Sequence, residues 1–454
     1  MRIFRHYVEP RLVALGLIEA AILFGCFFIG YFLRYADVAF LSSELKTHLP
    51  SALTFVFVMM ASLFALGLYE RAAIGDMAVV AVRLLAGFVC GFALLAVTLY
   101  LVPDLKVWRS ALVIAMPASF VVILIFRRLF LWLVDRDAFS RRILVLGDPG
   151  PIASIQALER RVGLAPFRTV RAILLGAVPD RANDDGWLLE ACRAVDAEEI
   201  VVAADERRGR LPMQALLRCR LAGLRVSEYH DFYERETGRV DLERLEPGWL
   251  VFRDGFSHSK AHLLVKRLFD VVLASVGLAC AMPLLLIAGL AIKLEDGGPV
   301  FFRQLRVGRN GMPFEIFKLR SMRVDAERDG PRWAAVGDRR VTRVGRILRR
   351  TRIDELPQLV NVLKGEMSFV GPRPERPVFV EKIVEVLPCF TVRHQMRPGL
   401  AGWAQLNYPY AANLEDARVK LEYDLYYVKN WSLFLDLLIL AQTFRVIVWG
   451  NGVR

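Results

Sequence analysis

Four long apolar stretches open this chain and constrain its fold more than any other feature of the sequence. A helix of about 20 residues crosses the hydrocarbon core of a bilayer, and each stretch is close to that length. The mean hydropathy of +0.38 and the hydrophobic content of 55% support this interpretation, since both are high for a soluble protein. We therefore predict a mixed membrane protein that begins with a four-helix transmembrane bundle in residues 1–138. The stretches cover residues 12–33, 52–69, 79–102 and 111–134.

Arginines flank this region at both ends and predict its orientation. Arg2, Arg5 and Arg11 precede the first stretch, and a second group crowds the end of the fourth. Because positively charged flanks stay on the cytoplasmic side, both ends are predicted to be cytoplasmic, as an even number of spans requires. The first stretch is too long for a signal-peptide core and has no small-x-small cleavage site, so we expect it to be retained. The second group comprises Arg127, Arg128, Arg136, Arg141 and Arg142.

Two charged residues, Glu19 and Arg83, lie within the apolar stretches. A charge inside a membrane segment is a candidate functional residue by default. Both residues are within reach of an interface, however, and long side chains near helix ends extend their charged groups toward water. We therefore expect both side chains to snorkel.

Net charge and cysteine content narrow the class of protein further. The formal charge of +13 suits nucleic acid, an anionic membrane surface or phosphorylated substrates, and composition does not choose among them. The six cysteines are scattered, with no C-x-x-C pair and no histidine at metal-ligand spacing. We expect reduced thiols, no structural zinc and a cytoplasmic location for the soluble parts.

Short aliphatic strands alternate with amphipathic helical stretches over residues 142–255. Such alternation predicts a parallel sheet, and we assign residues 139–258 to a Rossmann-like α/β middle domain. The turn Gly147-Asp148-Pro149-Gly150 occupies the place of a dinucleotide fingerprint but lacks the G-x-G-x-x-G pattern, and Pro149 and Pro151 have no amide to offer a phosphate. A structural or regulatory sheet is therefore favoured over a nucleotide site. The predicted strands are 143–147, 199–204 and 224–228, and the predicted helices are 152–161 and 213–222.

A fifth apolar run, residues 268–292, opens the last region, which we assign to an α/β catalytic domain over 259–454. Its length fits a membrane span, but a crossing would place the arginine-rich segment that follows outside the cytoplasm, against the positive-inside trend. Pro283, near the middle of the run, removes a backbone hydrogen bond and kinks the helix. We predict a re-entrant helix near residues 266–293. A straight span with a proline kink stays open as the alternative.

An acidic pair follows a cluster of basic residues in this domain. Seven arginines and no acidic residue lie between Arg339 and Arg352, and Asp354-Glu355-Leu356-Pro357 comes directly afterwards. Apolar residues at helical spacing follow, so Asp354 is predicted at a helix start, where its carboxylate caps free amides and Pro357 fits the first turn. An N-cap is the simpler interpretation. A carboxylate kept ionised by a helix N-terminus beside guanidinium groups would also lie in a site that attracts phosphates.

Two loops present further arginines, Arg373 in Gly371-Pro372-Arg373-Pro374 and Arg397 in the Arg397-Pro398-Gly399 turn. Glycine and proline fix such loops, and arginine grips phosphate oxygens with two donors. Residues 318–322 add Lys318 and Arg320 on a strand-like segment. The sequence has no Walker loop, G-x-S-x-G or H-E-x-x-H motif, so those chemistries have no local support.

Together these segments resemble the monotopic phosphoglycosyl transferase family, or bacterial sugar transferases, in the family's order over about residues 263–453. The apolar helices and the α/β domain before them resemble the long-form members, the polyprenyl-phosphate hexose-1-phosphate transferases. The matching segments are Lys266-Arg267-Leu268-Phe269-Asp270, 318–322, Asp354-Glu355-Leu356-Pro357-Gln358-Leu359, 361–374 and 397–405.

The resemblance implies a two-step reaction. Asp354, in the place of the family nucleophile, would attack the β-phosphorus of a UDP-sugar, release UMP and form a phosphosugar-aspartyl intermediate, which polyprenyl (undecaprenyl) phosphate then accepts. Glu355 would act in catalysis by holding Mg²⁺. Pro283 matches the break in the family's membrane helix, although Met282 stands where the family commonly has serine. The implied substrate-binding residues are Lys318, Arg320, Arg349, Arg373, Arg397 and Gln405.

Other features were less specific. Trp403 fits a uracil or sugar pocket and fits ordinary packing equally well. The stretch 431–449, rich in Leu and Phe, suits either an interfacial helix or a core helix of the catalytic domain.

The resemblance implies an enzyme of the bacterial inner membrane that is multi-pass, with its catalytic domain on the cytoplasmic face, and that initiates exopolysaccharide or other glycan assembly. We expect UDP-hexose, polyprenyl phosphate and membrane lipids as partners and no nucleic acid, and we leave the hexose and a homo-oligomer open. The alternative function is a membrane-anchored nucleotide sensor or scaffold without catalysis. A transporter is disfavoured by the number of spans.

Overall fold

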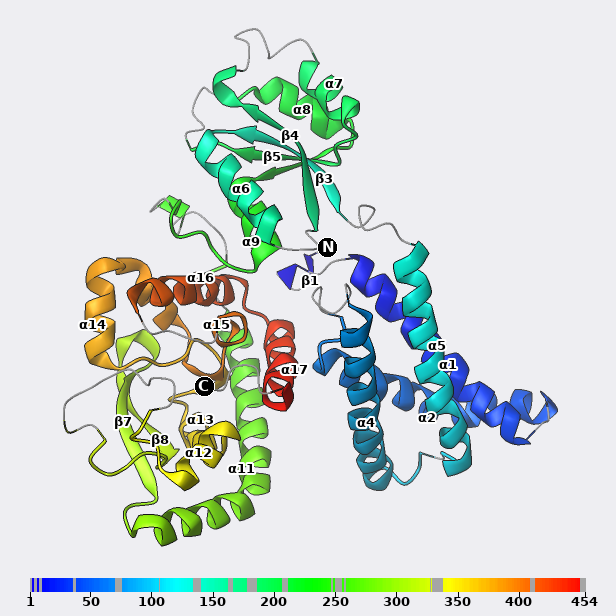
Figure 1. Cartoon of the computed structure of the whole chain (residues 1–454), viewed down its shortest axis with the longest axis vertical. Coiled ribbons are helices and arrows are strands. Elements are labelled where there is room, and N and C mark those ends of the chain that lie inside the picture. The colour runs from blue at the N-terminus through cyan, green and yellow to red at the C-terminus, as the bar shows by residue number, and fades with distance from the viewer. Residues whose placement is uncertain are drawn as a thin grey trace. The chain divides into compact units, whose positions relative to one another are not determined.

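The computed structural model describes the chain in two compact units, one over residues 8–237 and one over residues 238–454 together with residues 2–7 (Figure 1). The middle domain predicted at 139–258 thus contributes residues 238–258 to the second unit. The described residues are all except 1, 4–5, 8–9, 36–37, 70–75, 106, 134–139, 162–165, 178–185, 206–210, 246–247, 250–254, 257–258, 327, 329–337, 409–412 and 450–454.

The first unit begins with four long apolar helices, in agreement with the sequence prediction. They pack through a shared core that includes Phe27, Phe55, Leu84 and Ile123, while many leucine and valine side chains on their other faces are exposed. With α11 described below, five helices in the described part of the chain are long and apolar enough to cross a membrane. The four are α1 (Pro10–Tyr35), α2 (Val38–Ala65), α4 (Met77–Leu101) and α5 (Arg109–Leu133).

Glu19 does not snorkel, and that prediction is wrong. Its side chain is fully buried, and Arg127 of α5 donates from Nε to Glu19 Oε1 at 2.6 Å and from Nη2 to Oε2 at 3.1 Å. The Tyr69 hydroxyl donates to Glu19 Oε2 at 2.6 Å. A partner on another helix satisfies the carboxylate inside the bundle, so it has no need to reach water. Arg83 donates to the carbonyl of Gly67 in the turn after α2.

The parallel sheet predicted in the middle region is confirmed. Four strands pair in the order β4-β3-β5-β6, all parallel. Successive residues of β3 point to opposite faces, so Ile143 and Val145 pack with α6 and α9, while Leu144 and Leu146 pack with α7 and α8. The elements are β3 (Arg141–Gly147), α6 (Pro149–Arg161), β4 (Phe167–Leu174), α7 (Trp187–Ala194), β5 (Glu199–Ala203), α8 (Met213–Leu221), β6 (Arg225–Glu228) and α9 (Tyr229–Thr237).

The turn after β3 is built for packing between strands. A Cβ on Gly147 would lie 2.0 Å from the carbonyl oxygen of Ala203, so only glycine fits beside β5. Asp148 Oδ2 accepts a hydrogen bond from the backbone amide of Asp205 at 2.9 Å. Both contacts join the ends of β3 and β5, which agrees with the interpretation of this turn as structural.

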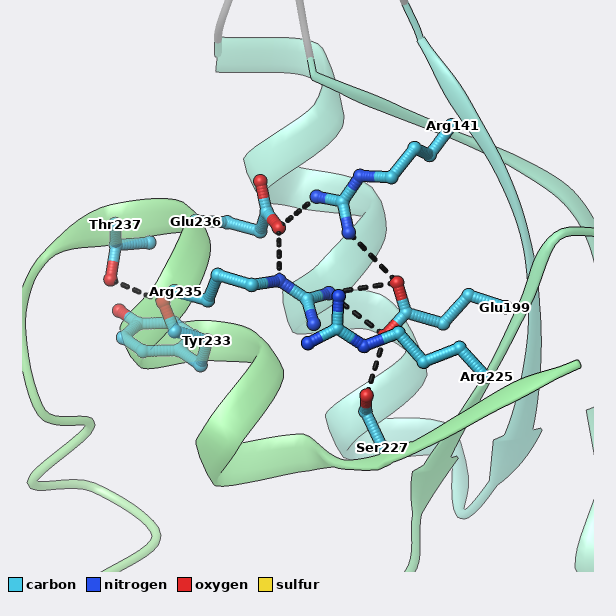
Figure 2. Close-up of polar contacts among 8 residues, drawn as sticks. All are labelled: Arg141, Glu199, Arg225, Ser227, Tyr233, Arg235, Glu236 and Thr237. Atoms are coloured by element: carbon cyan, nitrogen blue, oxygen red, sulfur yellow. Dashed lines mark hydrogen bonds and ion pairs between the residues drawn. The ribbon is translucent and has the colours of Figure 1, made fainter. Parts of the chain in front are cut away.

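A cluster of ion pairs lies at the opposite end of this sheet, where β3 and β5 begin (Figure 2). Glu199, 1% exposed at the start of β5, accepts hydrogen bonds from Arg141 at 2.8 Å and from Arg235 at 2.9 Å. Glu236 pairs with the same two arginines. Arg141 begins β3, whereas Arg235 and Glu236 end α9, so the cluster fastens together the first and last elements of the α/β region.

The second unit holds the α/β domain that the sequence assigns to catalysis. Strands β7 (Phe301–Val307) and β8 (Pro313–Leu319) pair antiparallel, and β9 (Ser368–Val370) pairs parallel with β10 (Gly399–Ala401). Two short strands near the N-terminus, β1 (Arg2–Ile3) and β2 (His6–Tyr7), pair antiparallel. The helices are α11 (Lys260–Asp296), α12 (Arg343–Arg350), α13 (Gln358–Lys364), α14 (Pro377–Val386), α15 (Trp403–Asn407), α16 (Leu414–Asn430) and α17 (Leu433–Trp449).

Helix α11 contains Pro283 and turns sharply along its length (Figure 1). Prolines commonly cause such bends, because the ring removes one hydrogen bond and displaces the preceding turn. Ala274, before the proline, packs in a core with Leu359 of α13, and Ile292, after it, packs with Leu348 of α12. Leucines and valines on the other side of both halves are exposed. Both halves therefore lie against the catalytic domain with one face and leave an apolar face uncovered.

The buried residues of helix α17 pack in the core of the catalytic domain. Leu435 and Ile439 are fully buried in the largest core of this unit, and Asp436 is buried and paired with Lys266 of α11 at 2.6 Å. Of the two interpretations left open by the sequence, packing in the catalytic domain describes these residues.

Candidate active site

The acidic pair lies in a tight turn between α12 and α13. Helix α12 begins at a well-capped end, where Glu295 Oε1 accepts hydrogen bonds from the amides of Arg343 at 2.7 Å and Val344 at 3.2 Å. After it, Arg352 adopts a left-handed backbone with φ of 60°, which is costly for a residue with a side chain. The chain then forms a short 3₁₀ turn over Ile353–Glu355.

The prediction that Asp354 caps a helix is therefore wrong. Pro357 is the residue that precedes α13, and no side chain caps that helix. The left-handed residue before the pair turns the chain early and places Asp354 in the separate 3₁₀ turn. Asp354 thus lies in the first turn of this short 3₁₀ helix and not at the cap of α13.

Glu355 is the electrostatic centre of the site. Its Oε1 accepts hydrogen bonds from Lys318 Nζ of β8 at 2.9 Å and from Arg373 Nη2 at 3.0 Å, and Arg352 Nη1 lies 3.7 Å from Oε2. Burial alone would raise the pKa of Glu355, but the charges of Lys318, Arg373 and Arg352 hold it well below the usual range. Glu355 therefore stays ionised.

Asp354 behaves in the opposite way. It is 7% exposed, and its Oδ1 is buried with no hydrogen-bond partner in the described part of the chain. Burial and the negative charge of Glu355 raise the pKa of Asp354 to about 6, against the opposing charges of Lys318, Arg349 and Arg352. Once deprotonated, this carboxylate is poorly solvated and has an oxygen free to react.

The loop that carries Arg373 is held rigidly. The amide of Gly371 donates to the carbonyl of Ala401 at 2.9 Å, and the amide of Gly399 donates to the carbonyl of Pro372 at 3.0 Å. A Cβ on Gly371 would lie 2.2 Å from the carbonyl oxygen of Arg397, so the two loops pack without room for a side chain there.

A buried arginine fixes the backbone of Arg373 directly. Arg393 donates to the Arg373 carbonyl at 2.7 Å and pairs with Asp424 of α16 at 2.8 Å. Sequence analysis missed the roles of Arg393 and Asp424, which lie in no motif and act through contacts between distant segments. It also missed the left-handed backbone of Arg352.

The structure brings four predicted site residues into direct proximity, with Arg349 near them. Lys318, Arg373, Asp354 and Glu355 form the cluster, and Arg349 acts on Asp354 through its charge.

The other predicted residues make different contacts. Arg320 instead pairs with Asp296 at the end of α11. Burial, with the charges of Arg309 and Arg267, lowers the pKa of the half-buried Arg397. Gln405 Oε1 is buried without a hydrogen-bond partner among the described residues.

Trp403 is a packing residue in this structure. Its ring stacks on Tyr426 with centroids 6.0 Å apart and lies edge-on to His6 at 5.6 Å. Its Nε1 donates to the carbonyl of Gly238 at 2.7 Å. Packing and a hydrogen bond thus account for the ring and for the polar atom of the indole.

The ionised Glu355 also fits the magnesium ion that the sequence predicts it to hold. No group of three His, Cys, Asp or Glu side chains gathers at metal spacing within the described ranges. Mg²⁺ is commonly held by one or two carboxylates together with substrate phosphates and water. Glu355, which lies beside Lys318 and Arg373, supplies one such carboxylate.

Comparison with known proteins identifies the family. The family model described as bacterial sugar transferase matches residues 261–450. The chain is 41% identical over 196 residues to a Bacillus subtilis protein described as the uncharacterized sugar transferase EpsL, and the alignment spans 42% of this chain and 91% of that protein. At that identity and coverage, this chain belongs to the bacterial sugar transferase family. The prediction of an enzyme of the transferase class is confirmed at the level of the family.

Two further relatives carry names that describe a reaction. The chain is 44% identical over 239 residues to a UDP-N-acetylgalactosamine-undecaprenyl-phosphate N-acetylgalactosaminephosphotransferase of Aeromonas hydrophila, which is 53% of this chain and 56% of that protein. It is 48% identical over 184 residues to a UDP-glucose:undecaprenyl-phosphate glucose-1-phosphate transferase of Caulobacter vibrioides, which is 40% of this chain and 68% of that protein. With its apolar helices, the chain is a bacterial membrane protein.

Proposed function

We propose that this protein transfers a hexose-1-phosphate from a UDP-sugar to undecaprenyl phosphate and releases UMP. The observation that carries the proposal is a buried Asp354 carboxylate, one oxygen of which has no hydrogen-bond partner among the described residues. Adjacent to it lies Glu355, which Lys318 and Arg373 contact directly. The names of the Aeromonas and Caulobacter relatives supply the substrate classes.

The reaction has two displacements at one phosphorus atom. A carboxylate oxygen of Asp354 attacks the β-phosphorus, the bond from that phosphorus to the bridging oxygen breaks, and UMP leaves with the electron pair. A phosphate oxygen of the lipid then attacks the same phosphorus and displaces the Asp354 carboxylate, which gives a polyprenyl diphosphate-linked hexose. A covalent intermediate lets one small site serve a soluble donor and a lipid acceptor in turn.

The surrounding cations neutralise charge during both steps. Lys318 and Arg373 each have donors beyond the ones that bind Glu355, and Arg349 and Arg352 act on the carboxylate of Asp354. A Mg²⁺ ion held by Glu355 would supply further charge neutralisation for the diphosphate. We assign substrate binding also to Arg397, Arg320 and Gln405, as the family resemblance implies.

We propose further that α11 re-enters the membrane surface on the cytoplasmic side. Lys266, near its start, pairs with Asp436, whereas Asp296, at its end, pairs with Arg320. Both ends are thus attached to the same polar domain, which supports entry and exit on one side of the bilayer. The four helices of the first unit would form a transmembrane bundle. The site would then face a lipid phosphate at headgroup level, and its product would initiate glycan assembly.

Release of UMP by the purified full-length protein tests the reaction. With Mg²⁺, undecaprenyl phosphate and a panel of UDP-hexoses, we expect one or a few donors to release UMP. The panel should include UDP-glucose, UDP-galactose and UDP-N-acetylgalactosamine. Without acceptor, labelled sugar phosphate should remain on the wild-type protein.

Asp354→Asn should abolish both UMP release and labelling, and Asp325→Asn, an exposed acid outside the site, is the matched control. Normal release by Asp354→Asn would exclude this nucleophile. Absence of UMP release by the wild-type protein with every donor would favour the alternative of a membrane-anchored sensor or scaffold.

A further inference from the structure

A buried carboxylate on α11 contacts a strand of the active site without belonging to the site. Asp270 and Ser368 are both fully buried. Asp270 Oδ1 accepts hydrogen bonds from Ser368 Oγ at 3.0 Å and from the backbone amide of Phe369 at 3.0 Å. Both donors belong to β9, so a single oxygen of the membrane helix fixes the start of that strand.

Strand β9 leads directly into the loop that presents Arg373. Only Val370, Gly371 and Pro372 separate Phe369 from Arg373. This connection has little freedom, because Gly371 is closely packed against the Arg397 carbonyl and proline restricts its own φ. A displacement of β9 would therefore be passed on to Arg373, whose Nη2 lies 3.0 Å from Glu355 Oε1.

The same turn of α11 also contacts α13, the helix that follows the acidic pair. Arg267 donates to the carbonyls of Val362 and Leu363, the latter at 2.6 Å, at the end of α13. Helix α13 begins just after Asp354 and Glu355. One turn of the membrane helix thus contacts the elements that follow the pair and the strand that precedes Arg373.

We propose that Asp270 is a positioning residue, which orients Arg373 against Glu355 by holding β9. The inference rests on the proposed function, and Asp270 itself touches neither substrate nor the reacting atoms. It gives a role to the acidic residue that interrupts the apolar run of α11 near its start, where a charge is otherwise costly.

Two substitutions separate this role from a general effect of charge. Asp270→Asn keeps the Oδ1 acceptor for both donors and removes the charge. Asp270→Ala removes the acceptor and leaves the Ser368 hydroxyl and the Phe369 amide buried without it. Loss of a side chain that supports an active-site residue typically lowers activity by about 10- to 100-fold. We expect a loss of kcat of that order for Asp270→Ala, with little change in KM for the lipid acceptor, and a loss of less than about threefold for Asp270→Asn.

A double-mutant cycle tests whether Asp270 acts through Arg373. If it does, Asp270→Ala should lower kcat little further in a protein that already carries Arg373→Ala. Ile383→Ala, which removes a buried side chain from α14, is the control for lost stability and should leave kcat unchanged at a comparable drop in Tm. Losses that multiply in the double variant, or an Asn variant as impaired as the Ala variant, would overturn the proposal.

Hydrogen exchange gives a readout that does not depend on activity. Peptides covering residues 368–373 should exchange faster in Asp270→Ala than in wild type or in Asp270→Asn. Absence of UMP release by the wild-type protein would reject the proposed function, and the exchange comparison would still decide whether Asp270 fixes β9. Unchanged exchange in Asp270→Ala would reject the positioning role.

Discussion

At the scale of single residues, two adjacent carboxyl groups are given opposite properties by their surroundings. Glu355 directly contacts Lys318 and Arg373, which hold its pKa well below the usual range. Asp354 has no such contact at its Oδ1, and burial beside Glu355 raises its pKa to about 6. Pairs of titratable groups whose pKa values are pushed apart commonly divide chemical roles between them. The division here suits one permanent charge and one nucleophile.

The raised pKa of Asp354 predicts the pH dependence of the reaction. The nucleophile must be deprotonated, and protonation below a pKa of about 6 removes it. We therefore expect kcat/KM for the UDP-sugar to fall tenfold for each pH unit on the acid side of about pH 6. UMP release measured from about pH 4.5 to pH 8 gives the profile. A plateau that continues down to about pH 4.5 would show that Asp354 titrates as an ordinary aspartate.

At the scale of helices and strands, periodicity and composition predicted the buried elements best. Strands β3 and β5 are continuous aliphatic runs in the centre of the sheet, and the sequence located both. It missed β4, an edge strand that carries Arg168 and Arg171, because these charges interrupt its apolar residues and such a strand has a neighbour on one side only. It also missed α7 and α9.

The active-site turn was predicted in composition but not in geometry. The order of motifs located the acidic pair and its nearest cations. The left-handed Arg352 was unforeseen, because local sequence favours continued helix there and long-range contacts override that preference. Arg320 was grouped with Lys318 by proximity in sequence, yet Arg320 reaches Asp296.

The ion pair between α1 and α5 predicts a specific pattern of stability. Glu19 and Arg127 are buried at 0% and 4% side-chain exposure, so removal of either partner leaves a charge without compensation. Breaking a buried pair costs about 3–5 kcal/mol, whereas replacing both partners by apolar residues is often neutral. We expect Glu19→Leu and Arg127→Leu each to unfold at lower temperature and the double variant to recover most of the loss.

Thermal unfolding in detergent measures this effect. Phe57→Ala, which changes an exposed side chain on α2, is the control for altered helix surface. A double variant that is less stable than either single variant would contradict the coupling.

Because both ends of α11 contact the same domain, we expect its C-terminal end to be accessible from the cytoplasmic side of the membrane. Leu294 is exposed near the end of the helix. In a protein without its six native cysteines, Leu294→Cys should react with a membrane-impermeant maleimide in inverted vesicles and remain unlabelled in intact spheroplasts. The reverse pattern would mean that α11 crosses the bilayer as a straight span. A cysteine at exposed Lys260, before the helix, reports the side on which it begins.

At the scale of the whole molecule, sequence analysis recognised the membrane helices, the parallel sheet and the family, but it could not anticipate the place of residues 2–7. These residues belong to the unit formed by residues 238–454. His6 Nδ1 lies 3.0 Å from the Tyr426 hydroxyl, and the imidazole packs edge-on against Trp403. Contacts between such distant positions leave no periodic trace in a single sequence.

His6 should therefore stabilise the catalytic domain. We expect His6→Ala to lower the Tm of the full-length protein, because the substitution removes the ring contact with Trp403 and one polar contact of the Tyr426 hydroxyl. Burial lowers the pKa of His6 to about 4, so the neutral imidazole is the stable form. The stability that His6 provides should be complete above its unfolded pKa of about 6.5 and should decline as pH falls toward 4. A pH-independent difference in Tm between the variant and wild type would contradict this role.

The pairing of His6 with Tyr426 also bears on the biogenesis of this protein. The two residues are 420 positions apart, so the whole intervening chain, including its apolar helices, must be synthesised before they can meet. His6 therefore has to wait without this contact while those helices are made. Its contact with Tyr426 is thus a late event in folding, and chains that terminate before Tyr426 would lack it.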